Sequence, residues 1–120
     1  MKLLKSFGYA FKGLKISWQQ RNFRLHLLAM FLVLLMGFGL SISRLEWLLI
    51  WLCVGTVISA EIFNTGLEKI ATFISTLSPQ AYQKMGEPKD LGAGAVLIAS
   101  LVSALVGTAI FGPYILEIIF

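Results

Sequence analysis

The sequence predicts an all-α integral membrane protein, in which three transmembrane helices follow an N-terminal amphipathic helix on the membrane surface. Its 120 residues are 58% hydrophobic and only 13% charged, whereas charged residues make up about a quarter of an average soluble domain. A soluble fold of this length buries too small a share of its surface to hide so much apolar mass. The composition therefore excludes a soluble enzyme, a disordered tail and a collagen-like fibre, and it indicates a single membrane domain.

Three stretches of the chain are long and apolar enough to cross a bilayer. A spanning helix needs about 20 mostly apolar residues, and the stretches that meet this requirement are residues 25–43, 47–68 and 91–116. The third contains Gly112 and Pro113, where we expect the helix to tilt or fray. Between the second and third stretches, residues 75–88 contain two prolines and a glycine among polar residues, which predicts the one true loop of the chain.

The basic residues predict how the chain is oriented. Six of the ten Lys and Arg residues lie in the first 24 positions, and three more lie between the second and third stretches. Because cytoplasmic segments carry the excess of Lys and Arg, we expect the N-terminus and the second loop to lie in the cytoplasm. The net charge of +4 and pI near 9.5 then reflect membrane topology, and we expect no nucleic-acid partner.

The N-terminal segment, residues 1–24, has the pattern of an interfacial helix. Its apolar residues recur at spacings of three and four, with the lysines off that stripe. Such a helix lies in the membrane surface, with its aromatic side in lipid and its lysines toward anionic headgroups. A simple positively charged topogenic anchor is an equally good interpretation of the pattern. The apolar positions are Leu3, Leu4, Phe7, Phe11, Leu14 and Trp18.

Polar residues interrupt the last third of the second stretch. At 100° per residue, Glu61, Asn64 and Glu68 fall within about 60° of one another on a helix. An acid at the centre of a bilayer costs roughly 2.5–3.5 kcal/mol on insertion scales, so these residues need partners. One interpretation is a helix end that reaches water, with Glu68 solvated. The other is a cation site, because carboxylate and amide oxygens suit Mg²⁺.

Lys89 and Asp90 stand directly before the third stretch. Each has an ordinary explanation, since Asp90 could cap the helix and Lys89 could be a topogenic charge. Together with the polar stripe, however, they place two acids, an amide, a lysine and an aspartate at the same membrane face. Phosphoryl transfer needs positioned Mg²⁺, a cation against the phosphates and a base near the attacking hydroxyl. The chain has no glycine-rich G-x-x-x-x-G-K-[ST] loop, so a nucleotide site of that kind is excluded.

The single histidine and the single cysteine indicate no metal site and no disulfide. His26 stands at the start of the first stretch, where a lone histidine is more often an interfacial residue than a ligand, and no second histidine is present for a metal site. Cys53 lies inside an apolar run. It is expected to be a packing residue, and one cysteine excludes a disulfide framework and a cysteine-based metal cluster.

Four segments resemble the small bacterial integral-membrane lipid kinases, a family that includes prokaryotic diacylglycerol kinase and undecaprenol kinase. Residues 8–18 resemble the surface-helix pattern of the family, and residues 22–26 (N-F-R-L-H) resemble the entry to its first span, N-F-R-I-H, typical of undecaprenol kinases. Residues 61–68 (E-I-F-N-T-G-L-E) resemble the signature E-x-x-N-[ST]-x-x-E. Residues 89–97 (K-D-L-G-A-G-A-V-L) resemble the opening of its third span. The similarity covers nearly the whole chain.

This resemblance implies a homotrimer in the bacterial cytoplasmic membrane, with active sites shared between neighbouring subunits. It implies ATP as co-substrate and Mg²⁺ as cofactor. Glu61 would be the base for the lipid hydroxyl, and Glu68 would bind Mg²⁺ together with ATP. Asn64 would be the amide beside them, and Trp18 would lie on the lipid side of the surface helix.

The resemblance also implies a set of nucleotide contacts. Lys89 and Asp90 would contact the nucleotide, Tyr9 would lie near the adenine, and Lys2 would stand where the family has a basic contact. At the position where the family often has a second metal-binding glutamate, this chain has Gln20. A glutamine can hydrogen-bond ATP or offer a carbonyl oxygen, but it brings no charge.

Two further departures from the family pattern affect the site. Thr72 stands where the family usually has an aspartate, and Ala93 stands where a serine is frequent. Because the five residues of the two signature motifs are all present, these changes favour an altered lipid preference or a slower enzyme over a loss of activity.

The leading hypothesis is an ATP- and Mg²⁺-dependent kinase that phosphorylates a lipid alcohol, undecaprenol or diacylglycerol, at the cytoplasmic face. The alternative is a small proton- or cation-coupled transporter, because acids within membrane helices also serve as proton relays. A third hypothesis is a structural or adaptor membrane protein without chemistry. A transporter would have no need of the Lys89–Asp90 pair, and an adaptor would tolerate Glu61→Gln.

Overall fold

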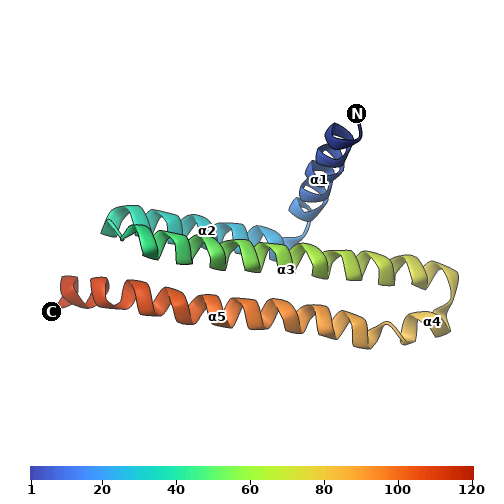
Figure 1. The fold of residues 1–120 in the computed structure, drawn as a ribbon. Helices are drawn as coiled ribbons and strands as arrows, with labels where there is room; N and C mark the ends of the chain where they lie inside the picture. Colours follow the sequence, from blue (N-terminus) through green and yellow to red (C-terminus); the bar gives the residue numbers. More distant parts are fainter.

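The computed structural model describes all residues from 1 to 120, and nearly all of them are helical. Three segments are long and apolar enough to cross a membrane, namely Arg21–Leu40, Arg44–Leu77 and Pro79–Ile119, which confirms the predicted all-α class and the number of spans (Figure 1). The helices are α1 (Lys2–Trp18), α2 (Arg21–Leu40), α3 (Arg44–Leu77), α4 (Pro79–Gln83) and α5 (Gly86–Ile119).

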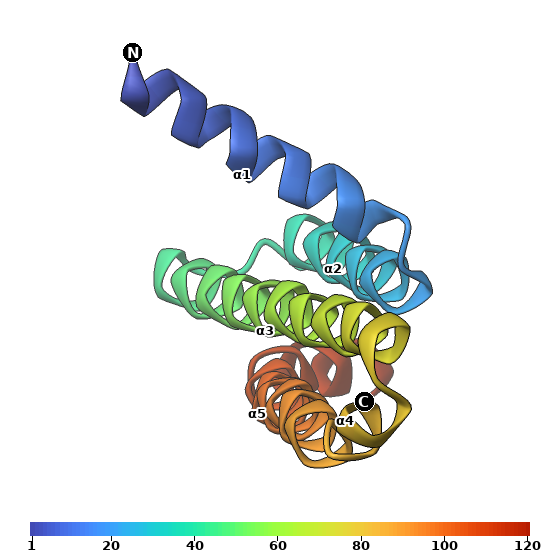
Figure 2. The same cartoon turned by 90° about the vertical axis from the view of Figure 1, so that its right-hand side faces the viewer.

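The long helices form a flat layer with α3 in the middle. Helix α3 packs against α2 on one side and α5 on the other, and the three run up and down in turn (Figures 1 and 2). The whole chain measures 60 × 39 × 20 Å along its principal axes. Helix α1 leaves the layer at a steep angle, and the N-terminus lies at its free end (Figure 1).

The main apolar core lies at the hairpin end of the layer, the end that holds the α2–α3 turn at residues 41–43. Its buried members come from the turn, α3 and α5, and they are Ile42, Ile50, Ile110 and Phe111. The hydroxyl of Tyr114 on α5 donates a hydrogen bond of 2.7 Å to Oε2 of Glu46 on α3. This bond adds a directional link between the two helices beside the apolar contacts.

Two local motifs fix the α2–α3 turn. Helix α2 ends with Ser41 in the left-handed region, at φ 51° and ψ 51°, and the N–H of Ile42 bonds the carbonyl of Gly37, as in a Schellman motif. Helix α3 then begins with a capping box. The hydroxyl of Ser43 accepts from the N–H of Glu46, and the carboxylate of Glu46 accepts from the N–H of Ser43. Both helix ends are thereby satisfied within a very short connection.

Helix α3 is longer than the bilayer requires. Its 34 residues extend about 50 Å at 1.5 Å per residue, whereas the hydrocarbon core is about 30 Å thick. The predicted span from Trp47 to Glu68 alone has about this length, so the turns after Glu68 are additional to what a span requires.

Residues 75–88 are not the loop that the sequence predicts. Ser78 caps α4 by accepting a hydrogen bond from the N–H of Ala81, with Pro79 at the first helical position, where proline is favoured because its missing N–H would have no partner there. Pro88 likewise lies in the first turn of α5. Pro79, Gly86 and Pro88 therefore lie in the first turns of helices. The loop prediction is wrong because it treats these residues as helix breakers.

The earlier start of α5 also corrects two other expectations. Asp90 lies inside the helix, whose N-cap is Met85, so the interpretation of Asp90 as a helix cap is wrong. Helix α5 continues through Gly112 and Pro113 to Ile119 and does not fray there.

The N-terminal segment divides differently from the predicted residues 1–24. Helix α1 ends at Trp18 and α2 begins at Arg21, with Gln19 and Gln20 in the connection. Arg21 and Arg24 therefore belong to the start of α2 and not to the N-terminal helix.

Substitution of Gly37 tests the close packing of the hairpin end. A Cβ at Gly37 would lie 2.6 Å from Cη2 of Trp47, so the indole must shift, and such overpacking typically destabilises by about 1–3 kcal/mol. We expect Gly37→Ala to lower the unfolding midpoint in detergent micelles. Gly39→Ala is the matched control, because nothing lies within 4 Å of its added Cβ. Equal midpoints for the two variants would contradict this packing.

Candidate active site

The polar stripe of α3 is split between the protein interior and the surface. Glu61, Asn64 and Thr65 are buried, with 3%, 7% and 4% of their surface exposed, whereas Glu68 is exposed. The interpretation of the stripe as a helix end that reaches water is therefore wrong for Glu61 and Asn64, and α3 continues beyond the exposed Glu68 to Leu77. We call the end of the layer that holds these residues the site end.

Gly92 brings the start of α5 against the polar stripe. A Cβ built at Gly92 would lie 2.5 Å from Oδ1 of Asn64 and 2.8 Å from Cδ1 of Leu67. Only glycine allows the two helices to approach this closely with Asn64 between them. Lys89 and Asp90 lie less than one turn before Gly92 on the same helix, so the structure brings both signature motifs to the site end.

The side chain of Asn64 has an unused acceptor. Its Oδ1 atom is buried and has no hydrogen-bond partner, and an unpaired buried group of this kind costs about 1–3 kcal/mol. Buried polar groups are nearly always paired in native proteins. The free oxygen therefore marks a place where a donor or a cation from a ligand would be stabilised.

Tyr82 of α4 is a neighbour of the site that sequence analysis missed. The Nζ atom of Lys89 lies 5.6 Å from the centroid of the Tyr82 ring, within the range of a cation–π contact. The contact holds the lysine side chain against α4. Because residues 75–88 were assigned to a loop, the sequence offered no basis for placing this tyrosine.

His26 is a second neighbour that the sequence did not assign to the site. Its Nε2 atom on α2 lies 3.7 Å from Oε2 of Glu61 on α3. The expectation of a merely interfacial histidine is therefore incomplete, because His26 faces the buried acid. Phe23 and His26 are three residues apart and share a face of α2, but only the structure, in which Phe23 is buried, shows that this face is turned inward.

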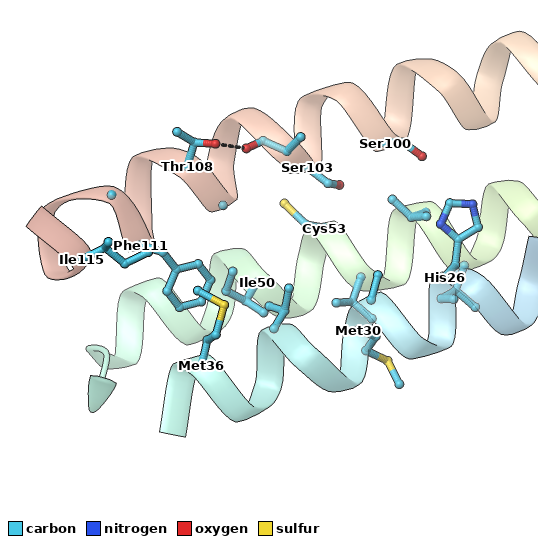
Figure 3. A pocket seen from close by; sticks show the side chains of 18 residues that line it. His26, Met30, Met36, Ile50, Cys53, Ser100, Ser103, Thr108, Phe111 and Ile115 are labelled. Carbon is cyan, nitrogen blue, oxygen red and sulfur yellow. Dashed lines mark hydrogen bonds between the residues drawn. The ribbon is translucent and has the colours of Figure 1, made fainter. Parts of the chain in front are cut away.

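A mostly apolar groove extends from His26 along the membrane-spanning part of the layer. Its volume is about 600 Å³, and side chains of α2, α3 and α5 line it. Figure 3 shows His26 at one end and Phe111 and Ile115 at the other. Besides His26 and Cys53, the polar groups in its wall are hydroxyls of α5, including Ser100, whose buried Oγ has no hydrogen-bond partner.

The remaining predicted site residues lie apart from this cluster in a single chain. Lys2 and Tyr9 belong to the outer part of α1, which extends away from the layer (Figure 2). Tyr9 is 71% exposed and Trp18 is 58% exposed. Gln20 is half-buried in the connection between α1 and α2. One chain thus unites Glu61, Asn64 and the start of α5 but does not bring Lys2 and Tyr9 to them.

A comparison with protein families identifies the chain. Residues 8–111 match the model of the family described as prokaryotic diacylglycerol kinase. The chain belongs to this family.

Named relatives agree with this assignment. The undecaprenol kinase of Bacillus subtilis is 32% identical, over 93% of this chain and 89% of the relative. The diacylglycerol kinase of Escherichia coli K12 is 28% identical, over 87% of this chain and 84% of the relative. The diacylglycerol kinase of Helicobacter pylori J99 is 32% identical, over 99% and 88%. No solved structure matches the chain.

Membership of the prokaryotic diacylglycerol kinase family makes the chain an enzyme of the lipid kinase class. This outcome favours the first of the three hypotheses over the transporter and the adaptor. It also agrees with the site end, where a buried acid, an amide and the Lys89–Asp90 pair lie on two adjacent membrane helices.

Two side chains of the site end carry oxygen atoms of the kind that would suit Mg²⁺ bound with a nucleotide. No three His, Cys, Asp or Glu residues converge on one point. A magnesium ion bound with a nucleotide is usually held by one or two carboxylates plus substrate phosphates and waters. The exposed carboxylate of Glu68 and the unpaired Oδ1 of Asn64 are oxygen donors of this type.

Gly92 provides a direct test of the contact between the two signature motifs. In Gly92→Ala the added methyl group would lie 2.5 Å from Asn64 Oδ1, so Asn64 must move away from α5. We expect kcat for lipid phosphorylation to fall about tenfold or more, since small displacements at a catalytic centre cost large factors. Gly94→Ala is the control, because nothing lies within 4 Å of its Cβ. A Gly92→Ala enzyme as active as Gly94→Ala would contradict the assigned contact.

Proposed function

We propose that this protein transfers the γ-phosphoryl group of ATP, in the presence of Mg²⁺, to the hydroxyl group of a membrane lipid at the cytoplasmic face. The observation that carries the proposal is the buried pair Glu61 and Asn64 on α3, placed against Gly92 of α5 directly after Lys89 and Asp90. A general base and charged phosphate contacts are what phosphoryl transfer to an alcohol requires.

The depth of the acids in α3 suits a substrate that is half lipid and half polar. Glu61 and Glu68 are seven residues apart, which is about 10 Å along the helix. If Glu68 stands where the hydrocarbon ends, Glu61 lies just inside it. A lipid alcohol can then present its hydroxyl to Glu61 from the bilayer while the nucleotide stays in water beside Glu68.

In the proposed reaction Glu61 accepts the proton of the lipid hydroxyl. The hydroxyl oxygen forms a bond to the γ-phosphorus of ATP, and the bond from that phosphorus to the β–γ bridging oxygen breaks. ADP leaves with the electron pair, and the products are the lipid phosphate, ADP and one proton. The barrier is lowered mainly by positioning and by charge stabilisation, because the protein forms no covalent intermediate.

The remaining residues have supporting roles in this proposal. Asn64 orients the reacting groups through its amide, and Lys89 and Asp90 contact the nucleotide. Glu68 would hold Mg²⁺ with ATP, and Gln20 would add a neutral oxygen ligand or a hydrogen bond to the nucleotide. Bound there, Mg²⁺ would neutralise charge on the phosphate oxygens.

We propose undecaprenol as the preferred acceptor, with diacylglycerol as the alternative. The proposal rests on residues 22–26, N-F-R-L-H, and on the similarity to a protein named undecaprenol kinase over 93% of this chain. The diacylglycerol kinases of the comparison support the alternative.

We further propose that the protein works as a homotrimer in the bacterial cytoplasmic membrane, with its N-terminus in the cytoplasm and α1 as an amphipathic helix on the membrane surface. The lysines of α1, together with Lys69 near the end of α3, Lys84 after α4 and Lys89 at the start of α5, support this orientation. The distance of Lys2 and Tyr9 from the cluster of Glu61 and Asn64 supports sharing of the site between subunits. Trp18 would face the lipid substrate.

A phosphorylation assay tests the proposal. Purified protein in micelles is given ATP labelled at the γ-phosphate, Mg²⁺, and either undecaprenol or diacylglycerol. We expect label in the lipid fraction, faster with undecaprenol, and no label after chelation of Mg²⁺. Glu61→Gln and Glu68→Gln should each lower the rate about 10²-fold or more, since the first removes the base and the second a metal ligand.

The matched control for both variants is Glu117→Gln, an exposed acid near the end of α5. It removes the same charge far from the site end and should leave the rate unchanged. If wild-type protein transfers no label to either alcohol, the proposed function is refuted. Transfer that survives in Glu61→Gln would leave the kinase but remove its proposed base.

Asn64→Ala separates catalysis from folding. Because the Oδ1 atom of Asn64 has no partner within the chain, its removal breaks no internal hydrogen bond of that atom. We therefore expect normal yield and thermal midpoint but a kcat lower by about tenfold or more. The control is Ser59→Ala, an exposed polar residue on the same helix. A parallel loss of yield and rate would assign Asn64 a folding role instead.

A further inference from the structure

We infer that His26 is a positioning residue that holds the carboxylate of Glu61 in the orientation needed for proton removal from the lipid hydroxyl. The inference rests on the proposed function, since it assigns a partner to the base of that reaction. It is carried by the contact of 3.7 Å between Nε2 of His26 and Oε2 of Glu61 and by the burial of the acid.

Glu61 needs a partner and has one candidate in the chain. Its side chain is 4% exposed, and a buried carboxylate without a partner is strongly unfavourable. No Lys or Arg nitrogen lies within 4.0 Å of it, and His26 is the only histidine. The imidazole therefore supplies the one side-chain charge or donor that the chain offers to this acid.

The geometry suits positioning more than a permanent bond. The separation of 3.7 Å exceeds the usual hydrogen-bond range of about 2.7–3.2 Å, and catalytic hydrogen bonds are often long before substrate binds. With Nε2 protonated, the ring donates toward Oε2 of Glu61 and leaves the other carboxylate oxygen free to accept the lipid proton. Movement of under 1 Å would complete the bond.

The fold fixes the histidine in this place. Phe23, one turn earlier on α2, is only 4% exposed, so its burial sets the rotation of the helix and turns His26 inward. The imidazole is 26% exposed, and it lies at the end of the apolar groove (Figure 3). It thus stands between that groove and the buried acid.

Three substitutions of His26 separate positioning from simple filling of space. The amide nitrogen of glutamine reaches about where Nε2 of histidine lies, whereas that of asparagine falls short, near Nδ1, and leucine has no donor. We expect His26→Gln to keep kcat within about threefold of wild type. His26→Asn and His26→Leu should lower kcat about tenfold or more at unchanged KM for ATP, because the nucleotide contacts are intact.

A spectroscopic measurement gives a readout that is independent of activity. Because the chain has a single histidine, ¹⁵N-histidine labelling yields one pair of imidazole signals in micelles. We expect Glu61→Gln to shift the Nε2 signal at fixed pH, since the partner changes from a carboxylate to an amide. Glu117→Gln removes an acid at the other end of α5 and should leave the signal in place.

The outcomes distinguish the two proposals. Wild-type protein that phosphorylates no lipid alcohol refutes the proposed function, while the imidazole signal still decides whether His26 contacts Glu61. An unshifted signal in Glu61→Gln overturns the contact. In an active enzyme, equal rates for all three His26 variants and wild type, or an equal loss in His26→Gln and His26→Leu, overturn positioning. Retained activity in His26→Gln alone, with a shifted signal, supports it.

Discussion

The burial of one carboxyl group constrains the rest of this small protein. Glu61 stands in a helix that is otherwise apolar over most of its length, and only 3% of its surface is exposed. Such a group is tolerated in a membrane helix only when polar partners surround it. Within the chain the partner is His26 on α2, while the start of α5 packs at Gly92 against Asn64, one turn further along α3. Helix packing at the site end therefore places a polar partner beside the buried carboxyl group of Glu61.

Much of the fold follows from the sequence, because a bilayer imposes strict requirements on length and polarity. The length of the mostly apolar stretches predicts the three spans, and Glu61 and Asn64 stand out because polar residues inside a span need partners. The signature motifs at residues 61–68 and 89–97 indicated the family, which the comparison confirms. Their proximity follows from a helical hairpin, in which neighbouring helix ends meet.

The sequence predictions are wrong where the same residue type is compatible with two different local structures. Pro79 and Pro88 break a helix in its interior but favour its first turn, so residues 75–88 were assigned to a loop although α4 and the start of α5 occupy them. That error also concealed the contact of Tyr82 with Lys89. His26 was undervalued because a single sequence does not show which face of α2 meets α3. Only the packing of neighbouring helices decides that.

The two ends of the layer differ in what holds them together. The hairpin end has the Schellman turn, the capping box, the Tyr114–Glu46 bond and the one sizeable cluster of buried apolar side chains. The site end relies on close approach at a glycine and on polar groups, one of which is unpaired. Regions with fewer buried apolar contacts open at lower free energy. The helices are therefore expected to separate more readily at the site end than at the hairpin end.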